Sequence, residues 1–223
     1  MLARLGVRYL TLTHIHNTNW ADSGTDEPAH GGLTDRGVEY VRELNRLGIL
    51  VDLSHVSTTT MHAALDVTDA PVIFSHSSCR ALTDHPRNVP DDVLARLRDN
   101  GGVLMVTFVP QFLSDDYYEW FRGPKDTPAP EVTISDVADH VEHARDVAGI
   151  RHIGLGSDFD GTDEFPRGLE GVDGFPALLA ELANRGWSAS DLAALAGANV
   201  LRVLRETDVA FEGASAGVPA LLR

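Results

Sequence analysis

The sequence has few of the residues that disulfide-bonded and nucleic-acid-binding proteins need. Its 223 residues include one cysteine, Cys79, and one lysine, Lys125, and the net charge is −15. A single cysteine excludes an internal disulfide bond, so we expect a cytoplasmic protein. The acidic balance argues against nucleic acid and against anionic membranes as partners, because both require a basic face.

Long apolar runs and nucleotide-binding motifs are also missing. No run approaches the ~20 apolar residues that span a bilayer, and the first residues turn polar too early for a secretory signal peptide. No G-x-G-x-x-G motif or P-loop follows an apolar segment, so nucleotide binding has no support. The 43% of hydrophobic residues suffices for the core of one large domain.

What the sequence does contain is an alternation of apolar, β-rich segments with helical segments. The five predicted strands are nearly continuously apolar, as in parallel strands covered on both faces. Their ranges are 8–13, 49–54, 71–75, 103–109 and 152–157. The predicted helices span 35–47, 57–68, 91–99, 135–148, 175–185 and 190–205. Thr34, Ser57 and Ser135 are the expected caps of three of these helices.

Strands and helices that alternate in one direction form a parallel sheet with right-handed crossovers. The α/β fold is then a (β/α) barrel or an open doubly wound sheet, with the functional site at the carboxyl ends of the strands. We expect one domain over residues 1–208 and a loose tail over 209–223. The proline-rich stretch 110–131 is predicted to be a long loop or an excursion that forms part of a pocket wall.

Residue types that bind metals stand at four of the five predicted strand ends: His14, His55, His76 and Asp158. His55 and His76 are about one strand–helix–strand step apart, and neighbouring strands lie ~4.8 Å apart. Their imidazoles can therefore reach one metal ion. Each histidine alone is equally well explained as a hydrogen-bonded rim residue. Together with Asp158 they favour a hydrolytic site with Zn²⁺ or a similar divalent ion.

The other histidines carry weaker signals. His140 and His143 are three residues apart on one predicted helix, which allows a metal site. Because His140 has apolar neighbours such as Val137 and Val141, we favour a packed role for it. We expect structural or solvated roles for the remaining ones, His30, His62, His85 and His152.

Five segments of the chain together resemble the membrane (renal) dipeptidase family. In chain order they are "GVRYLTLTHIHNTNWADS", "ELNRLGILVDLSHVS", "APVIFSHSSCRALTDHPRNVPDDVL", "IGLGSDFDG" and "ANVLRVL", within residues 6–205. The pair "DLSHVS" and "FSHSS", followed by "RNVPDD", is the most specific part. The resemblance implies a TIM-type (β/α) barrel that uses zinc to hydrolyse dipeptides with a free C-terminal carboxylate.

The resemblance also implies roles for individual residues. His55 and His76 correspond to the two imidazole ligands of one zinc ion. Asp158 corresponds to a ligand of a second zinc ion that also contacts the substrate and shuttles a proton. His14 corresponds to a histidine that contacts the substrate and polarises the reaction intermediate. Arg87 corresponds to the arginine that binds the substrate carboxylate, a role that suits a fork-shaped guanidinium.

Two ligand motifs of that family have no counterpart in these residues. The family takes an H-x-D pair from its first strand and a bridging glutamate from an E-G-G segment, and neither motif occurs here. The resemblance implies about five of eight βα units. We therefore expect an incomplete barrel, a dipeptidase without its N-terminal part. Such a chain would be weak or inactive alone, with the missing segment or a second copy as its partner.

Two alternatives stay open from the sequence. The first is a complete amidohydrolase-like site rewired from His14, His16, His55, His76 and Asp158. It requires His14 and His16 to alternate along one strand and so to share a face. The second is a non-catalytic homologue that keeps the scaffold and binds a partner or a small ligand.

Overall fold

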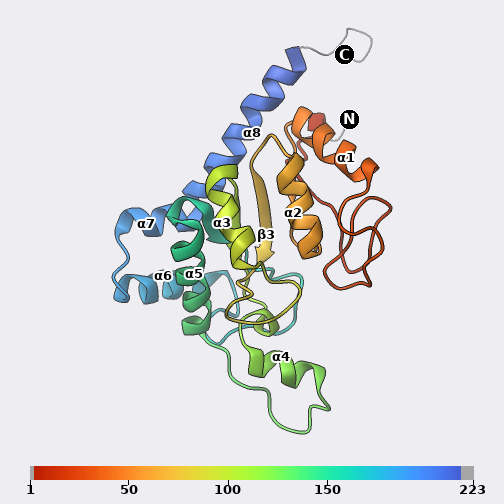
Figure 1. Cartoon of the computed structure of the whole chain (residues 1–223). Coiled ribbons are helices and arrows are strands. Elements are labelled where there is room, and N and C mark those ends of the chain that lie inside the picture. Colours follow the sequence, from red (N-terminus) through yellow and green to blue (C-terminus); the bar gives the residue numbers. More distant parts are fainter. Residues whose placement is uncertain (1–2, 217–223) are drawn as a thin grey trace.

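The computed structural model describes residues 3–216 (Figure 1), with side chains described as far as residue 207. At its centre lies one parallel sheet whose strands follow one another in chain order. The strands are β1 Tyr9–Thr11, β2 Leu50–Asp52, β3 Val72–Ser77, β4 Val103–Val106 and β5 Ile153–Leu155. The predicted α/β fold with five parallel strands is confirmed. Among the described residues the sheet is open, since β1 and β5 each pair with one strand.

Helices form the crossovers between the strands, as parallel pairing requires. The first three are α1 Asp35–Arg46, α2 Thr58–Val67 and α3 Asp91–Asn100. Thr34 and Ser57 cap α1 and α2 as predicted, because their side-chain oxygens accept the N–H groups of Gly37 and Thr60. Gly101 ends α3 in the left-handed region, at a φ of 82°.

The predicted start of the next helix is wrong by two residues. Helix α5 spans Ile134–Ala148 and is capped by Thr133, not by Ser135. The Thr133 side chain accepts the N–H of Ser135, and the Asp136 carboxylate accepts the N–H of Thr133. Because of this reciprocal capping box, the helix begins before Ser135, which therefore lies in its first turn.

The stretch 110–131 is not a continuous loop. It contains a 3-10 turn, η2 Pro110–Phe112, and helix α4 Asp115–Arg122, which Ser114 caps by accepting the N–H of Tyr117. Three of the four prolines of this stretch lie after α4, where they do not interrupt it. Figure 1 shows α4 beyond the arrowhead of β3, that is, on the carboxyl side of the sheet.

The last predicted helix is divided into two. Helix α6 Phe175–Asn184 precedes α7 Ala189–Ala193, a π turn Ala194–Ala198, and α8 Asn199–Ala216. The backbone of Gly197 is not helical, and this interrupts the predicted span 190–205. The predicted start of a loose tail, at residue 209, lies within α8; residues 217–223 lie outside the described residues.

Successive residues of a strand pack into two different apolar clusters. Val51 and Val72 belong to the main core under the crossover helices. Leu50 and Ile73 belong to a smaller cluster with Val203 of α8. Apolar contact on both faces explains why the strand sequences are nearly continuously hydrophobic. No helix among the described residues is long and apolar enough to cross a membrane.

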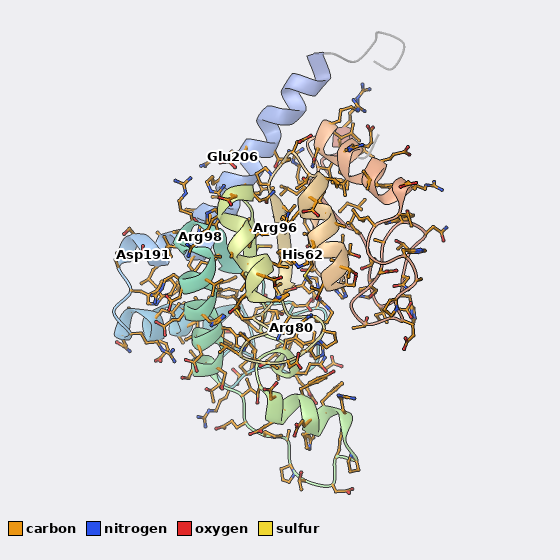
Figure 2. All side chains as sticks on the ribbon, in the orientation of Figure 1. His62, Arg80, Arg96, Arg98, Asp191 and Glu206 are labelled. Carbon is orange, nitrogen blue, oxygen red and sulfur yellow. The ribbon has the colours of Figure 1, made fainter. Side chains whose placement is uncertain are left out.

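Helices α2 and α3 are linked by polar side chains on the outside of the molecule (Figure 2). Arg96 of α3 pairs with Asp66 of α2 at 2.6 Å. His62 of α2 lies 3.1 Å from a carboxylate oxygen of Asp92. His62 therefore has the structural role that was expected for it.

Candidate functional site

The carboxyl side of the sheet opens into a cavity of about 1190 Å³. Its lining includes His14, His55, His76, Arg87 and Asp158. The structure thus gathers around one space all five residues that the sequence pointed to for catalysis, substrate binding or metal binding. Their chemical roles stay predictions.

The stretch after β4 supplies another part of the wall. Phe112 of η2 and Tyr118, Phe121 and Arg122 of α4 line the cavity. The Tyr117 hydroxyl donates a hydrogen bond to the Glu164 carboxylate, which joins α4 to the segment after β5. The prediction that this stretch forms a pocket wall is confirmed, although the wall is helical.

His55 and His76 converge at the ends of two neighbouring strands. Their Nε2 atoms are 2.8 Å apart. The His14 ring follows, with its centroid 4.5 Å from that of His55. The three imidazoles therefore form a continuous row along one side of the cavity.

Burial keeps the two converging imidazoles neutral. Burial, together with the charge of Arg87, lowers the pKa of His55 to about 2. The same two causes lower the pKa of His76, and the nearby carboxylates of Asp158 and Asp52 oppose the change. Neutral imidazole is the form that binds a metal ion.

The donor set of this chain fits a divalent metal only in part. Two neutral imidazoles whose Nε2 atoms converge suit two ligand positions of Zn²⁺. Across residues 3–207, no group of three histidine, cysteine, aspartate or glutamate side chains could hold a metal ion. Asp158 lines the same cavity but does not complete a three-residue group with the pair. Further ligands must come from water or from other residues.

Two of the lining residues have strained backbones. His55 and Asp158 adopt φ values of 72° and 64°, in the region that favours glycine. A chain holds such residues only where the surroundings fix them, and this occurs often at functional sites. At Asp158 a backbone hydrogen bond closes the turn, since the N–H of Gly161 donates to the Asp158 carbonyl oxygen at 3.0 Å.

The loop after β1 holds the histidine row in place. The buried hydroxyl of Ser23 donates to the carbonyl oxygen of His14 at 2.8 Å and also lies 3.3 Å from that of His55. The N–H of Gly24 donates to the same His55 carbonyl at 2.7 Å. A Cβ at Gly24 would lie 2.9 Å from the carbonyl oxygen of Pro86, so glycine permits this close approach.

Arg87 brings a buried positive charge to the cavity. It is 5% exposed, its Nη2 donates to the carbonyl oxygen of His76 at 3.2 Å, and its guanidinium lies over the Phe112 ring. Its Nη1 is buried and has no hydrogen-bond partner among the described residues. Burial lowers the pKa of Arg87 to about 10, against the opposing charges of Asp158 and Asp52, so the side chain stays charged at pH 7.

Other histidines lie away from this cluster or have structural partners. His16 is exposed and its Nδ1 lies 3.5 Å from Asp26. Strand β1 ends at Thr11, so His14 and His16 do not alternate along a strand, and the rewired site is not assembled. His140 is 1% exposed and its Nδ1 accepts the N–H of Cys79, which confirms the packed role.

Asp52 and Ser75 belong to the site but were not predicted from the sequence. Asp52 is fully buried at the end of β2, and Ser75 contacts the Nδ1 of His76. A signal for Asp52 was present, since an aspartate inside an otherwise apolar strand is rarely buried without a specific role. Nothing in the sequence showed that Ser75 would lie between Asp52 and His76.

Comparison with known proteins decides the family. The model described as "Membrane dipeptidase (Peptidase family M19)" matches residues 1–216. This chain belongs to that family. Dipeptidase verJ of Clonostachys rogersoniana is 50% identical over 204 residues, which are 91% of this chain and 49% of that protein. The chain spans about half the length of the curated relatives it matches.

Solved structures of two peptidases share the fold. The probable dipeptidase PvdM from Pseudomonas aeruginosa gives a TM-score of 0.83 at 28% identity, over 93% of this chain and 64% of that one. A metallo peptidase from Rhodobacter sphaeroides, liganded with a phosphinate mimic of the dipeptide L-Ala-D-Ala, gives 0.80 at 30% identity. That match covers 92% of this chain and 57% of the other.

Proposed function

We propose that this chain carries the substrate-binding side of a zinc-dependent dipeptidase. The reaction would be hydrolysis of the peptide bond of dipeptides that have a free C-terminal carboxylate. Membership of the family and the cavity shared by His14, His55, His76, Arg87 and Asp158 support the proposal. We propose zinc, two ions in the complete site, because imidazole and carboxylate without cysteine suit that metal.

The observation that carries the proposal is the free donor of Arg87. A buried guanidinium N–H without a partner costs about 1–3 kcal/mol or more, unless a ligand accepts its hydrogen bond. Arg87 lines the cavity next to two converging neutral imidazoles, and its buried Nη1 is such a donor. A substrate carboxylate would accept this bond and neutralise the charge. Arg87 would then place the peptide bond beside the histidines.

The remaining residues have complementary tasks in the proposed reaction. A divalent metal held by His55 and His76 would polarise the peptide carbonyl and activate water. His14 would donate a hydrogen bond to the carbonyl oxygen as negative charge develops there. Asp158 would accept a proton from the attacking water and pass it to the leaving amine.

We further propose that the chain alone is a weak or inactive enzyme. The described residues supply two imidazoles and Asp158, and a bridging carboxylate is missing from the donor set. The other ligands would come from the segment that carries the family's H-x-D and E-G-G motifs, or else from a second copy of the chain. The free edges of β1 and β5 are where such a segment would pair. With a single cysteine, we place the protein in the cytoplasm.

A second candidate function is non-catalytic binding. The absence of a three-residue metal group among the described residues favours it. In that case Arg87 would still bind a small carboxylate ligand, and zinc would have no effect on binding. Zinc-dependent ligand binding would argue against this candidate.

The proposal is tested by comparing two proteins. The first is the 223-residue chain, and the second is the product of the same reading frame extended upstream to an H-x-D and an E-G-G motif. With Zn²⁺, the extended protein should hydrolyse simple dipeptides such as Ala-Ala, and the shorter chain should hydrolyse them weakly or not at all. No dipeptide hydrolysis by a zinc-loaded extended protein would contradict the proposed function. Efficient zinc-dependent turnover by the shorter chain would contradict its proposed incompleteness.

A further inference from the structure

A buried carboxylate joins three neighbouring strands close to the histidine row. Asp52 is fully buried at the end of β2. Its Oδ1 accepts the backbone N–H groups of Ser54 and Ser75, each at 3.0 Å. Its Oδ2 accepts the hydroxyls of Thr11 at 2.7 Å and of Ser75 at 2.6 Å. All four partners are donors, so the carboxylate is fully occupied as an acceptor.

The Ser75 hydroxyl has a second contact that fixes the position of a proton. Its Oγ lies 2.7 Å from Nδ1 of His76. Ser75 has one hydroxyl proton and donates it to Asp52 Oδ2, so its oxygen can only accept in the contact with His76. The contact with His76 is a hydrogen bond only if the imidazole donates through Nδ1–H.

We propose that Asp52 and Ser75 are positioning residues that hold His76 in its Nδ1–H tautomer, with the Nε2 lone pair facing the cavity. This tautomer is the one that can bind a metal through Nε2. The inference rests on the proposed function for the identity of the ligand, since it explains how the chain prepares His76 for a divalent ion. Groups that orient a metal-binding histidine in this way raise metal affinity.

The tautomer of His76 also determines the tautomer of the neighbouring His55 ring. The two Nε2 atoms are 2.8 Å apart, and a hydrogen bond between them needs one proton. If the His76 Nε2 is the acceptor, His55 must carry its proton on Nε2 in the metal-free chain. The two rings therefore have opposite tautomers.

The direct test is the tautomer of each ring in the metal-free, 223-residue chain. Long-range ¹H–¹⁵N correlation spectra at pH 7.5, with assignments from His55→Gln and His76→Gln, distinguish Nδ1–H from Nε2–H. We expect Nδ1–H for His76 and Nε2–H for His55. An Nε2–H tautomer at His76 would overturn the inference. The tautomers are measured in the wild-type chain, and the two variants serve only to assign its resonances.

Asp52→Asn reverses the direction of the chain of hydrogen bonds. The amide oxygen would accept the two backbone N–H groups, which leaves the NH₂ facing Ser75 Oγ. Ser75 would then receive that bond and donate its own proton to His76 Nδ1. We expect His76 to change to the Nε2–H tautomer, which packing alone would not cause. An unchanged tautomer in folded Asp52→Asn would contradict the proposal.

Ser75→Ala and Ser77→Ala form a matched pair on the same strand. Ser77 is fully buried, and its hydroxyl lies 3.3 Å from Ser54 Oγ. Unlike the Ser75 hydroxyl, it does not contact the His76 ring. We expect Ser75→Ala to give a mixture of His76 tautomers, and Ser77→Ala to leave the wild-type tautomer. Equal effects of the two variants would refute the role of Ser75.

Zinc affinity gives an independent readout. In competition with a chelator, Ser75→Ala and Asp52→Asn should bind Zn²⁺ about tenfold to a hundredfold more weakly than the wild type. Ser77→Ala should bind as the wild type does, and an equal loss in all three variants would count against the proposal. Failure of the proposed function would look different, since the wild-type tautomers would be as expected while the zinc-loaded extended protein hydrolyses no dipeptide.

Discussion

At its amino end the sheet is closed by α8, where the Asn199 amide donates to the carbonyl oxygens of Ile150 and Ile153 and where Val203 is fully buried. At its carboxyl end the same sheet opens into the cavity, where Arg87 has a buried donor without a partner among the described residues. The short strands thus separate a packed end from an end that opens into a cavity. Stability and chemistry are placed at opposite ends of the same strands.

The backbone shows the same division. Of the described non-glycine residues with positive φ, two line the cavity, His55 and Asp158, and Lys125 lies beyond α4. Such conformations cost about 1–3 kcal/mol each. The cavity end therefore contains strain that the packed end must offset. Substitutions at the two ends should change stability in opposite directions.

The largest expected effect is at the packed end. Asn199→Ala removes the side-chain amide that donates to both carbonyl oxygens. We expect the free energy of unfolding to fall by about 2–4 kcal/mol. Leu201→Ala, on the exposed side of the same helix, should change it by less than about 0.5 kcal/mol. Urea denaturation measures both, and similar losses would show that Asn199 has no special role there.

The next effect concerns ligand binding at the cavity end. Arg87→Lys keeps the charge but loses the planar fork and the free Nη1 donor. We expect the affinity for Ala-Ala to fall by about tenfold to a hundredfold, the range of one charge-assisted hydrogen bond. The C-terminal amide of Ala-Ala should bind equally weakly to the wild type and the variant. Calorimetric titration checks this, and a wild type that does not distinguish acid from amide would contradict the role of Arg87.

Acid should destabilise the chain through its buried, neutral histidines. Burial lowers the pKa of His140 from 6.5 to about 4. Between these values the unfolded chain binds a proton that the folded chain does not. Stability is therefore fully present above pH 6.5 and is lost as the pH falls, by about 1.4 kcal/mol per pH unit for one such histidine.

The pH dependence can be assigned to a particular residue with two variants. His140→Gln should reduce the slope of unfolding free energy against pH by about one proton between pH 6 and 5. Val172→Gln, at an exposed site and without a titratable side chain, should leave the slope unchanged. Urea denaturation at several pH values gives the slopes. An unchanged slope in His140→Gln would show that His140 is not neutral in the folded chain.

The smallest expected effect is a gain in the free energy of unfolding, at the cavity end. Asp158→Gly relieves a positive φ, so we expect the free energy of unfolding to rise by about 1 kcal/mol. Asp160→Gly, two residues away and without a positive φ, should lower it by about 0.5–1 kcal/mol. Denaturation curves of the pair give the sign directly. A loss of stability in Asp158→Gly would contradict the claim that the cavity end contains backbone strain.

The sheet could be predicted from the sequence because the apolar residues that mark each strand lie within that strand. A run such as residues 72–74 is apolar throughout, which is typical of a strand covered on both faces. Cap signals placed α1 and α2 for the same reason, since Thr34 and Ser57 act on residues three positions away. Local rules failed where two of them competed. At the start of α5, Thr133 and Ser135 are both good caps, and the Asp136 carboxylate selects Thr133.

The cavity residues were predictable only as strand-end residue types. His55 and His76 could be paired from the sequence because neighbouring parallel strands end at one edge. The hydrogen bonds from Asp52 through Ser75 to His76 join side chains of two strands, so no spacing along the chain reveals them. The position of α4 was hidden for a similar reason. Its contact through Tyr117 and Glu164 joins segments that are far apart in the sequence.

The most direct test of the cavity as a metal-dependent site is a titration of the ¹⁵N-labelled chain with Zn²⁺, followed at the imidazole nitrogens. The Nε2 resonances of His55 and His76 should shift together and saturate at one equivalent, while His16 and His143 stay unchanged. That result would show that the two strand ends bind one ion. Shifts confined to the other histidines, with His55 and His76 unchanged in excess zinc, would contradict the account.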